Sequence, residues 1–285
     1  MGYRFMCYPG GVRKAVTFSY DDGSTDDIKL IDSFNQYNLK ATLNINSDRL
    51  LNGSGISLSD AKRFLKDGHE IAVHGKFHKA NGISRPIDGI RDVLLCREEL
   101  ENSLGKIIRG MAYPDTGITN FANGTDYETV KRYLADLGIV YSRTLGGDNN
   151  SFSLPDDWYC WMPTVHHNNK NIFSYIDDFI SLDLENNYHA MRHPRLFYVW
   201  GHSFEFASES SWEHLDKICS LLGNREDVWY ATNIEIYDYV NAYNSLISSA
   251  DGKIIYNPTL YDIWFAEGSK RYCAASGQSL VIDEE

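Results

Sequence analysis

Short hydrophobic runs alternate with longer amphipathic stretches along most of the chain. Runs rich in β-branched and aromatic residues predict strands, and stretches with apolar residues at helical spacing predict helices. We expect strands at Ala15–Ser19, Ala41–Ile45, Glu70–Val73, Ile108–Ala112, Ile139–Ser142, near Trp158–Trp161, and at Leu196–Trp200 and Val228–Ala231. We expect helices at Asp26–Tyr37, Asp60–Lys66, Ile87–Leu104, Tyr127–Leu137, near Ile172–Leu182, and at Trp212–Leu222 and Ile234–Ser248. This alternation predicts an α/β fold with a mostly parallel sheet.

The number of alternating pairs bears on the shape of the sheet. About seven strand-and-helix pairs favour a closed or nearly closed barrel over an open sheet, and we expect this barrel to span residues 1–249. After Ser248 the pattern changes, and short runs at Lys253–Asn257, Asp262–Ala266 and Ser279–Ile282 predict strands separated by turns. We expect residues 250–285 to form a small β appendage packed on the barrel.

Composition limits the partners of this fold. The chain has 285 residues, of which 43% are hydrophobic, enough for a sizeable core. Its 27 Lys and Arg against 39 Asp and Glu give a net charge of −12, which argues against nucleic acid or an anionic membrane as a partner. A neutral or cationic substrate fits better, and the sequence leaves open whether the chain forms a homo-oligomer.

The cysteine spacing and the hydropathy pattern bear on the cellular compartment of the protein. The five cysteines are widely spaced and never form a Cys-x-x-Cys pair, so neither a disulfide framework nor a thiolate metal site is indicated. No apolar run at the start resembles a signal peptide, and none approaches the roughly 20 apolar residues of a membrane span. We therefore expect a soluble, cytoplasmic protein, unless an export segment has been removed.

Two adjacent carboxylates, Asp21 and Asp22, directly follow the first predicted strand. Adjacent side chains at a strand end diverge, so one carboxylate can bind a metal ion while the other faces a substrate. Two carboxylates held close together also repel, and a cation is the simplest way to keep both ionised. The alternative is a solvated turn before a helix.

Two histidines follow the third predicted strand. If the chain turns helical there, His74 and His78 lie one turn apart on one face and can reach the same ion. With Asp22 they make a two-histidine, one-carboxylate set that leaves positions open for water and substrate. His69 precedes its strand, at the opposite end of the sheet, where a structural role is expected. Three further histidines are assigned to surface or packing roles: His189, His193 and His214.

Other polar residues follow the remaining strands at the same end of the sheet. They are Tyr113 and Asp115, Arg143, His166 and His167, and His202. In a parallel barrel these positions all open on the face at the carboxyl ends of the strands, where such folds assemble their sites. The sequence therefore predicts a single site at that face.

Four segments resemble motifs of a known family. Thr17–Gly23 is similar to the Thr-Phe-x-x-Asp-Asp-Gly motif of polysaccharide deacetylases, and His74–His78 resembles their His-Ser/Thr-x-x-His motif. Ala112–Asp115 resembles a variant of the third motif, and Tyr198–His202 resembles the last, an apolar strand that ends in a histidine. Over Lys14–Ala231 the chain thus resembles the polysaccharide deacetylase family (NodB homology, carbohydrate esterase family 4), which implies a distorted (β/α)7 barrel.

The resemblance implies a role for each matching residue. Asp22, His74 and His78 would hold a divalent ion, usually zinc, with cobalt or nickel as alternatives. Asp21 would act as the general base that takes a proton from the attacking water. His202 would act as the general acid that protonates the leaving group, which an amine requires.

Further residues are expected around the substrate. By analogy with the family, the backbone N–H of Asp115 would help to hold the oxyanion. Tyr113, His166, His167, Trp161 and Glu205 are expected to line the substrate groove, because sugar faces stack on aromatic rings. For Trp161, plain packing in the core is the alternative.

The chain departs from the family pattern at two motif positions. Gly75 replaces a Ser or Thr whose hydroxyl would brace the metal-binding turn. Ala112 replaces the arginine that orients the base, and Arg143 is the candidate to supply a guanidinium near the substrate, with a surface or structural ion pair as the alternative. The nearest match to the family's fourth motif is Asp157–Trp158.

These features predict a metal-dependent hydrolase that removes acetyl groups from an N- or O-acetylated carbohydrate, with a soluble oligosaccharide or small conjugate favoured over a cell-wall polymer. The alternatives are an amide or cyclic-imide hydrolase on the same scaffold and a non-catalytic carbohydrate-binding protein. The latter would predict loss of Asp21 or His202, and both are present. A purely structural metal site is disfavoured because a fourth coordination position is expected to be open.

Overall fold

The computed structural model describes residues 3–146, 148–185 and 192–282, so His189 lies outside the described residues. Its largest sheet has eight strands in the order β6-β5-β4-β3-β2-β8-β7, with β9 paired to β2 off this path. These strands are β2 (Lys14–Asp21), β3 (Ala41–Ile45), β4 (Glu70–Val73), β5 (Gly110–Ala112), β6 (Tyr141–Arg143), β7 (Val165–His166), β8 (Arg195–Gly201) and β9 (Val228–Tyr230). All their pairings are parallel, which confirms the predicted α/β fold.

The sheet curls because one segment touches both of its edges. Trp161 forms a parallel bridge with Arg143 at the end of β6. Just beyond it, Val165 and His166 form β7 and pair with β8. This connection brings the two edges of the sheet together and produces the distorted (β/α)7 barrel implied by the family resemblance.

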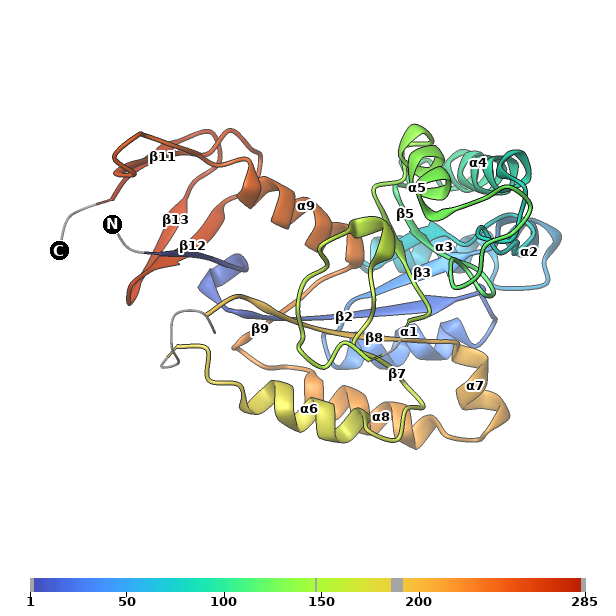
Figure 1. Ribbon diagram of the computed structural model, residues 1–285. Coiled ribbons are helices and arrows are strands. Elements are labelled where there is room, and N and C mark those ends of the chain that lie inside the picture. Colours follow the sequence, from blue (N-terminus) through green and yellow to red (C-terminus); the bar gives the residue numbers. More distant parts are fainter. Residues whose placement is uncertain (1–2, 147, 186–191, 283–285) are drawn as a thin grey trace.

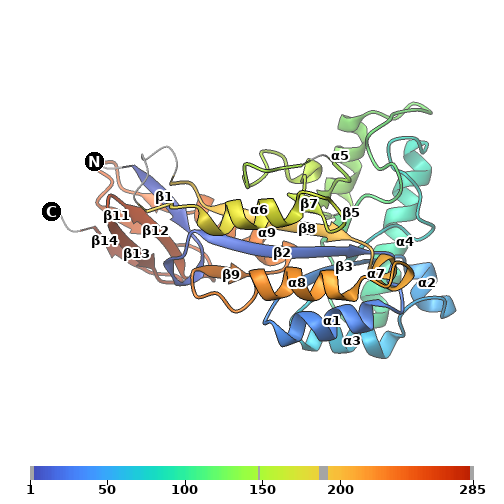
Figure 2. The ribbon, with the colours of Figure 1, turned by 90° about the horizontal axis from the view of Figure 1, so that it is seen from below.

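Helices cover the outside of the curled sheet. They are α1 (Asp27–Gln36), α2 (Ser47–Asn52), α3 (Leu58–Lys66), α4 (Pro86–Leu104), α5 (Tyr127–Asp136), α6 (Ile172–Ser181), α7 (Ser203–Ser208), α8 (Trp212–Leu222) and α9 (Asn233–Asn244). Helices α6 and α8 lie together along β2 and β8, and α4 and α5 form a separate pair (Figures 1 and 2). Within the described ranges, no helix combines the length and apolar content needed to cross a bilayer.

Strand β2 shows how the sequence positions the site. Phe18 and Tyr20 are fully buried in the main hydrophobic core between the sheet and the helices. Ser19 and Asp21 alternate with them and face the barrel interior, where both accept hydrogen bonds from the side-chain amide of Asn44. The period-two alternation therefore places the first carboxylate of the Asp-Asp pair inside the barrel.

The predicted elements agree closely with the structure for most of the barrel, and two need correction. Residues predicted as a strand near Trp158–Trp161 form a 3-10 helix, η2 (Trp158–Cys160), in which the Asp157 side chain caps the helix by accepting the backbone N–H of Tyr159. The last predicted helix was extended too far: α9 ends at Asn244, and Ile247–Ser248 form strand β10. Several short elements were not predicted: β1 (Arg4–Cys7), η1 (Pro9–Gly11), α2, α7 and β13 (Lys270–Ala274).

The C-terminal residues form two small antiparallel sheets. One has the order β1-β12-β13, with β12 at Ile263–Glu267, and the other has the order β10-β11-β14, with β11 at Ile254–Tyr256 and β14 at Ser279–Val281. Strand β1 comes from the N-terminus, so both chain ends lie at this appendage (Figure 1).

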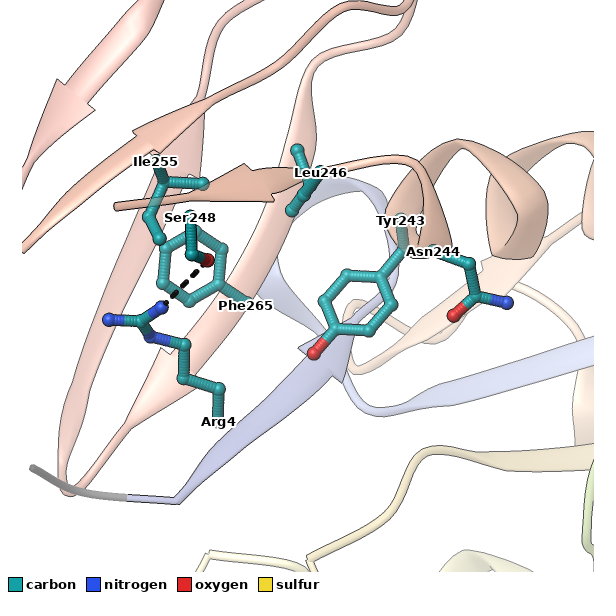
Figure 3. Close-up of a pocket in the computed structure, with 7 residues that line it drawn as sticks. All are labelled: Arg4, Tyr243, Asn244, Leu246, Ser248, Ile255 and Phe265. Atoms are coloured by element: carbon teal, nitrogen blue, oxygen red, sulfur yellow. Dashed lines mark hydrogen bonds between the residues drawn. The ribbon is translucent and has the colours of Figure 1, made fainter. Parts of the chain in front are cut away.

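Contacts through α9 attach the appendage to the barrel. The Tyr239 hydroxyl donates to the carbonyl of Cys7 in β1 and accepts the backbone N–H of Trp264 in β12, both at 2.9 Å. A pocket of about 260 Å³ lies between the end of α9 and the small sheets, and Arg4 donates to the Ser248 hydroxyl there (Figure 3). The rest of the Arg4 guanidinium contacts Glu267 and the carbonyl of Gly252, so this side chain joins the two small sheets.

Candidate metal and catalytic site

A pocket of about 290 Å³ opens at the carboxyl ends of the barrel strands. Its lining includes seven of the residues predicted from the sequence: Asp21, Asp22, His74, His78, Tyr113, Asp115 and His202. Thr116 and Leu145 complete the lining. The other predicted residues lie outside this lining: Arg143 contacts Asp21 inside the barrel, His166 and His167 contact Glu205, and Trp161 is in the core.

The two adjacent carboxylates diverge because the backbone turns sharply between them. Asp21 ends β2, whereas Asp22 has a φ of 79° and Gly23 a φ of 65°. A positive φ is unfavourable for a residue with a side chain, and such strain concentrates at functional sites. The turn aims the Asp22 carboxylate at the two histidines, while Arg49 lies 3.6 Å from its other oxygen.

His74 and His78 converge through a loop and not through the helical turn expected from their spacing. Gly75 and His78 both have positive φ, 70° and 55°, which is incompatible with a continuous helix. Even so, one ligand atom from each histidine and from Asp22 lie within 4.8 Å of one another. The three side chains therefore come together as predicted, but through a loop and not through the predicted helical turn.

The ring of His74 is fixed by the strand next to it. Its Nδ1 lies 2.9 Å from the carbonyl oxygen of Ala112, which makes Nδ1 the protonated nitrogen and leaves the Nε2 lone pair facing Asp22. Burial lowers the pKa of His74 below its usual value, although the Asp21 and Asp22 carboxylates oppose this shift. A neutral imidazole with a free Nε2 is the form that binds metal ions.

Asp92 in α4 braces the loop between the histidines. Its carboxylate accepts the backbone N–H of Phe77 at 2.7 Å, and burial raises its pKa. A Cβ at Gly75 would collide with this carboxylate, so the glycine leaves room for it. On the other side, the Asn46 amide donates to the carbonyl of His74 at 2.6 Å. The carboxylate and the amide hold the loop in the absence of the hydroxyl that the family usually places at position 75.

Arg143 lies against Asp21 inside the barrel. Its guanidinium donates to Asp21 Oδ2, with the two side chains 0% and 1% exposed, and Asn44 donates to Oδ1 at 2.8 Å. Burial alone would raise the pKa of Asp21, but Arg143, followed by His74 and His202, lowers it below the usual value. Ala112 is the register neighbour of Arg143, so a guanidinium one strand away reaches the carboxylate.

His202 follows β8 and contacts a carboxylate in the next helix. Its Nδ1 lies 3.3 Å from Glu205 Oε1 in α7. Burial would lower the pKa of His202, but Glu205 and the charge of Asp21 raise it above the usual value. His166 and His167 also contact Glu205, at 3.3 and 2.9 Å, and the imidazoles lower its pKa despite its burial. Glu205 therefore lies among three imidazoles, and not in the lining of the pocket.

Tyr113 and Asp115 lie on the loop that follows β5. Tyr113 is buried, and its hydroxyl donates to the carbonyl of Tyr159 at 2.8 Å. Asp115 is exposed and has a φ of 51°. Among the described residues, no acceptor takes the Asp115 backbone N–H. This donor is available at the pocket rim.

The predicted groove position of Trp161 is not what the structure shows. The side chain is 1% exposed and packs against the rings of Tyr141, Trp158 and Tyr198 at centroid distances of 4.9–5.3 Å. Its core role follows from its position in the segment that closes the barrel. Asp157, the expected fourth-motif carboxylate, accepts instead from Lys131 and Tyr127 and caps η2.

Sequence reasoning missed several residues that support the site. Asn44 contacts Asp21 because β3 lies beside β2 in a register that pairs the two positions. Arg49 and Asp92 come from helices, where charged residues are common and carry no local signature of function. An asparagine inside a buried strand is unusual, and this feature of Asn44 could have identified it.

The chain matches the family model for polysaccharide deacetylases over residues 9–140. No curated protein sequence matches it. Among solved structures, Puue allantoinase has a similar fold, with a TM-score of 0.58 and 12% identity over 81% of this chain and 91% of that one. A probable polysaccharide deacetylase from Pseudomonas aeruginosa PAO1 gives a TM-score of 0.57 and 13% identity over 81% of this chain and 92% of that one.

A third structure, the Streptococcus pyogenes deacetylase PplD, is 19% identical over 46% of this chain, with a TM-score of 0.41, and this chain spans 55% of its length. At these identities the allantoinase and the Pseudomonas aeruginosa protein show a similarity of fold alone. Residues 9–140, a little under half of the chain, are similar in sequence to the polysaccharide deacetylase family.

Proposed function

We propose that this chain is a metal-dependent deacetylase that hydrolyses the acetyl group of an N- or O-acetylated carbohydrate. The main support is the convergence of Asp22, His74 and His78 in one pocket with Asp21 and His202. The match of residues 9–140 to the polysaccharide deacetylase family model adds support, because the matched segment contains the first two motifs.

The residues around Asp22 fit a small divalent ion. Asp22 Oδ1 lies 3.7 Å from His74 Nε2 and 3.5 Å from His78 Nε2. Ligand atoms about 2.0–2.2 Å from a tetrahedral zinc are about 3.3–3.6 Å apart, so the spacing suits such an ion. Asp22, His74 and His78 would hold it, and the set also suits cobalt or nickel. When bound, the ion would polarise the acetyl carbonyl and lower the pKa of a water molecule.

Asp21 is the proposed general base. Arg143 and Asn44 hold its two oxygens, so the carboxylate is fixed at the pocket and stays ionised. A base in this position takes the proton from water as the water attacks the acetyl carbon. The contact with Arg143 keeps Asp21 from reorienting during that transfer.

His202 is the proposed general acid. The raised pKa keeps its ring protonated closer to neutral pH, with Nδ1 towards Glu205. A proton from this ring goes to the leaving amine or sugar oxygen. An amine leaves poorly unless it is protonated, so the acid is needed most for N-acetyl substrates. The Asp115 backbone N–H is the proposed donor to the oxyanion that forms at the carbonyl oxygen.

A C–N hydrolase acting on an amide or cyclic imide is the alternative. The specific observation in its favour is the fold shared with an allantoinase. The same base and acid would serve either substrate, because both reactions add water to a carbonyl and expel a leaving group, nitrogen or oxygen, that must take up a proton. A non-catalytic carbohydrate-binding role is less well supported, since the pocket retains Asp21 and His202.

Acetate release tests the proposal. Metal-stripped protein is assayed on N- and O-acetylated oligosaccharides with and without zinc, cobalt or nickel. We expect release only with metal, and a loss of about 10²–10⁴-fold in kcat for Asp21→Asn. His78→Asn should lose the ion bound by Asp22 and His74, whereas His193→Asn, at an exposed histidine beside Phe5, is the matched control and should retain it.

The outcomes separate the two candidates. Metal-dependent acetate release that disappears in Asp21→Asn supports the deacetylase. If metal binds but none of the oligosaccharides yields acetate, the sugar substrate is wrong. Ring opening of cyclic amides by the same protein would then favour the C–N hydrolase.

A further inference from the structure

A second group of metal-ligating side chains lies beside the pocket. It consists of His166 at the end of β7, His202 after β8 and Glu205 in α7, and its ligand atoms lie within 4.8 Å of one another. The three side chains are 25%, 23% and 24% exposed, so a small ion can reach them from solvent. Only His202 belongs also to the pocket lining.

Two imidazole nitrogens of this group lie near the Glu205 carboxylate, each beside a different oxygen. His166 Nε2 lies 3.3 Å from Glu205 Oε2, and His202 Nδ1 lies 3.3 Å from Glu205 Oε1. Ligand atoms on a tetrahedral zinc are separated by about 3.3–3.6 Å, because each lies about 2.0–2.2 Å from the ion. Two imidazoles and one carboxylate also repeat the donor set of the first cluster.

The group contains polar atoms that lack hydrogen-bonding partners. His202 Nδ1 lies 3.3 Å from Glu205 Oε1, and Glu205 Oε2 lies 2.9 Å from His167 Nε2. Both His202 Nδ1 and Glu205 Oε2 are shielded from solvent, and neither contact has the geometry of a hydrogen bond. Buried polar atoms are normally paired, so these atoms need a partner. A cation placed between them would satisfy both.

The fully buried His167 orients the Glu205 carboxylate from the side away from solvent. His167 Nε2 lies 2.9 Å from Glu205 Oε2, and the His167 ring packs against Phe206 and Tyr20. The carbonyl of His167 is in turn 2.7 Å from His214 Nε2. Outer partners of this kind orient carboxylate ligands in metal sites.

Binding an ion here has a cost. His166 Nδ1 accepts the backbone N–H of Asn168 at 3.1 Å, which places the ring proton on Nε2. Coordination through Nε2 requires that proton to move to Nδ1, and the Asn168 N–H then turns to water, because Asn168 is exposed. We therefore expect this site to bind more weakly than the first.

We propose that His166, His202 and Glu205 form a second divalent-metal site, and that zinc bound there inhibits the enzyme. The inhibitory part rests on the proposed function, because it requires His202 to be the acid. On binding, His202 releases its Nδ1 proton to solvent and forms a bond from Nδ1 to the ion. The ring then retains one proton, on Nε2, and losing it would leave an imidazolate. Metal-bound His202 therefore cannot donate a proton to the leaving group near neutral pH.

Metal titration of the full chain tests the site itself. Chelator-stripped protein is titrated with Co²⁺ and followed by calorimetry and visible absorption. We expect two ions per chain, the second bound at least tenfold more weakly. His78→Asn should lose the tight ion and keep the weak one, whereas His166→Asn should do the reverse. His193→Asn is the matched control and should bind both, and thermal melts verify that each variant is folded.

Inhibition is measured as a ratio within each protein. Acetate release with one equivalent of zinc is compared with release at tenfold excess. We expect excess zinc to slow the wild type by tenfold or more and to affect His166→Asn less than twofold. Binding of a single ion by the wild type, or a weak ion that persists in His166→Asn, would overturn the site. Because binding in His78→Asn is measured without activity, this failure is distinguishable from failure of the deacetylase proposal.

Discussion

The guanidinium of Arg143, the last residue of β6, donates to the carboxylate of Asp21, the last residue of β2, inside the barrel. Neither side chain is open to water. Two charges buried together are stable only as a pair, so each depends on the other. Arg143 takes the place of the arginine for which Ala112 is substituted in the third motif, because Ala112 and Arg143 are neighbours in the sheet register.

Replacing Arg143 should impair the proposed base. Without the guanidinium, the pKa of Asp21 rises, so the carboxylate becomes protonated at higher pH and the acidic limb of the kcat/KM profile moves upward. We expect Arg143→Met to lower kcat/KM by about 10²-fold or more and to cost about 3–5 kcal/mol of stability.

Arg143→Lys keeps the charge but not the planar fork, so we expect an intermediate loss and a smaller shift of the limb. Arg132→Met, on the exposed face of α5, is the control. Steady-state kinetics from pH 5 to 9 make the measurement. An unshifted acidic limb in folded Arg143→Lys and Arg143→Met would show that Arg143 does not act on the base.

Gly75 and Asp92 should behave as a coupled pair. A methyl group at position 75 would collide with the Asp92 carboxylate. The backbone there also has a φ of 70°, which is unfavourable for a residue with a side chain. We expect Gly75→Ala to cost about 1–3 kcal/mol and to weaken cobalt binding, because the histidine loop must shift. In Asp92→Ala the space is free, so adding Gly75→Ala should cost less there. Urea unfolding of all four proteins measures this coupling, and purely additive losses would contradict the proposed contact.

Asp27 should make stability depend on pH. Its carboxylate is fully buried at the start of α1, and burial raises its pKa from 3.8 to about 8. The stability gained from holding that proton is fully present below about pH 4 and is lost as the pH rises through about 8. We expect Asp27→Asn to flatten the decline in unfolding free energy between pH 4 and 8. Asp136→Asn, on an exposed part of α5, should leave the curve unchanged. If the unfolding free energies of wild type and Asp27→Asn changed with pH in the same way, Asp27 would not be the group responsible for the decline.

Trp161 should contribute to stability and not to substrate binding. The ring is enclosed by Tyr141, Trp158 and Tyr198. We expect Trp161→Ala to cost about 3–5 kcal/mol and Trp161→Phe considerably less. Thermal unfolding and KM are measured together for Trp161→Phe, which should fold. If Trp161→Phe had a raised KM but unchanged stability, Trp161 would contribute to substrate binding and not to the core.

The strands and helices of the barrel could be predicted from the sequence because their patterns are local. β2 alternates between residues that face the helices and residues that face the interior, and Asp21 continues that alternation. The candidate metal-ligand cluster could also be predicted, since Asp22, His74 and His78 all follow strands that end at the same face of a parallel barrel.

The rest depended on contacts between distant segments. Whether Arg143 reached Asp21 or the surface was decided by the register of β6 with β5 and by the curl of the sheet. Trp161 was drawn into the core because its segment closes the barrel. Strand β1 pairs with β12, which lies near the other end of the chain. Local patterns determine which face of an element is apolar, whereas its neighbours depend on how all the elements pack together.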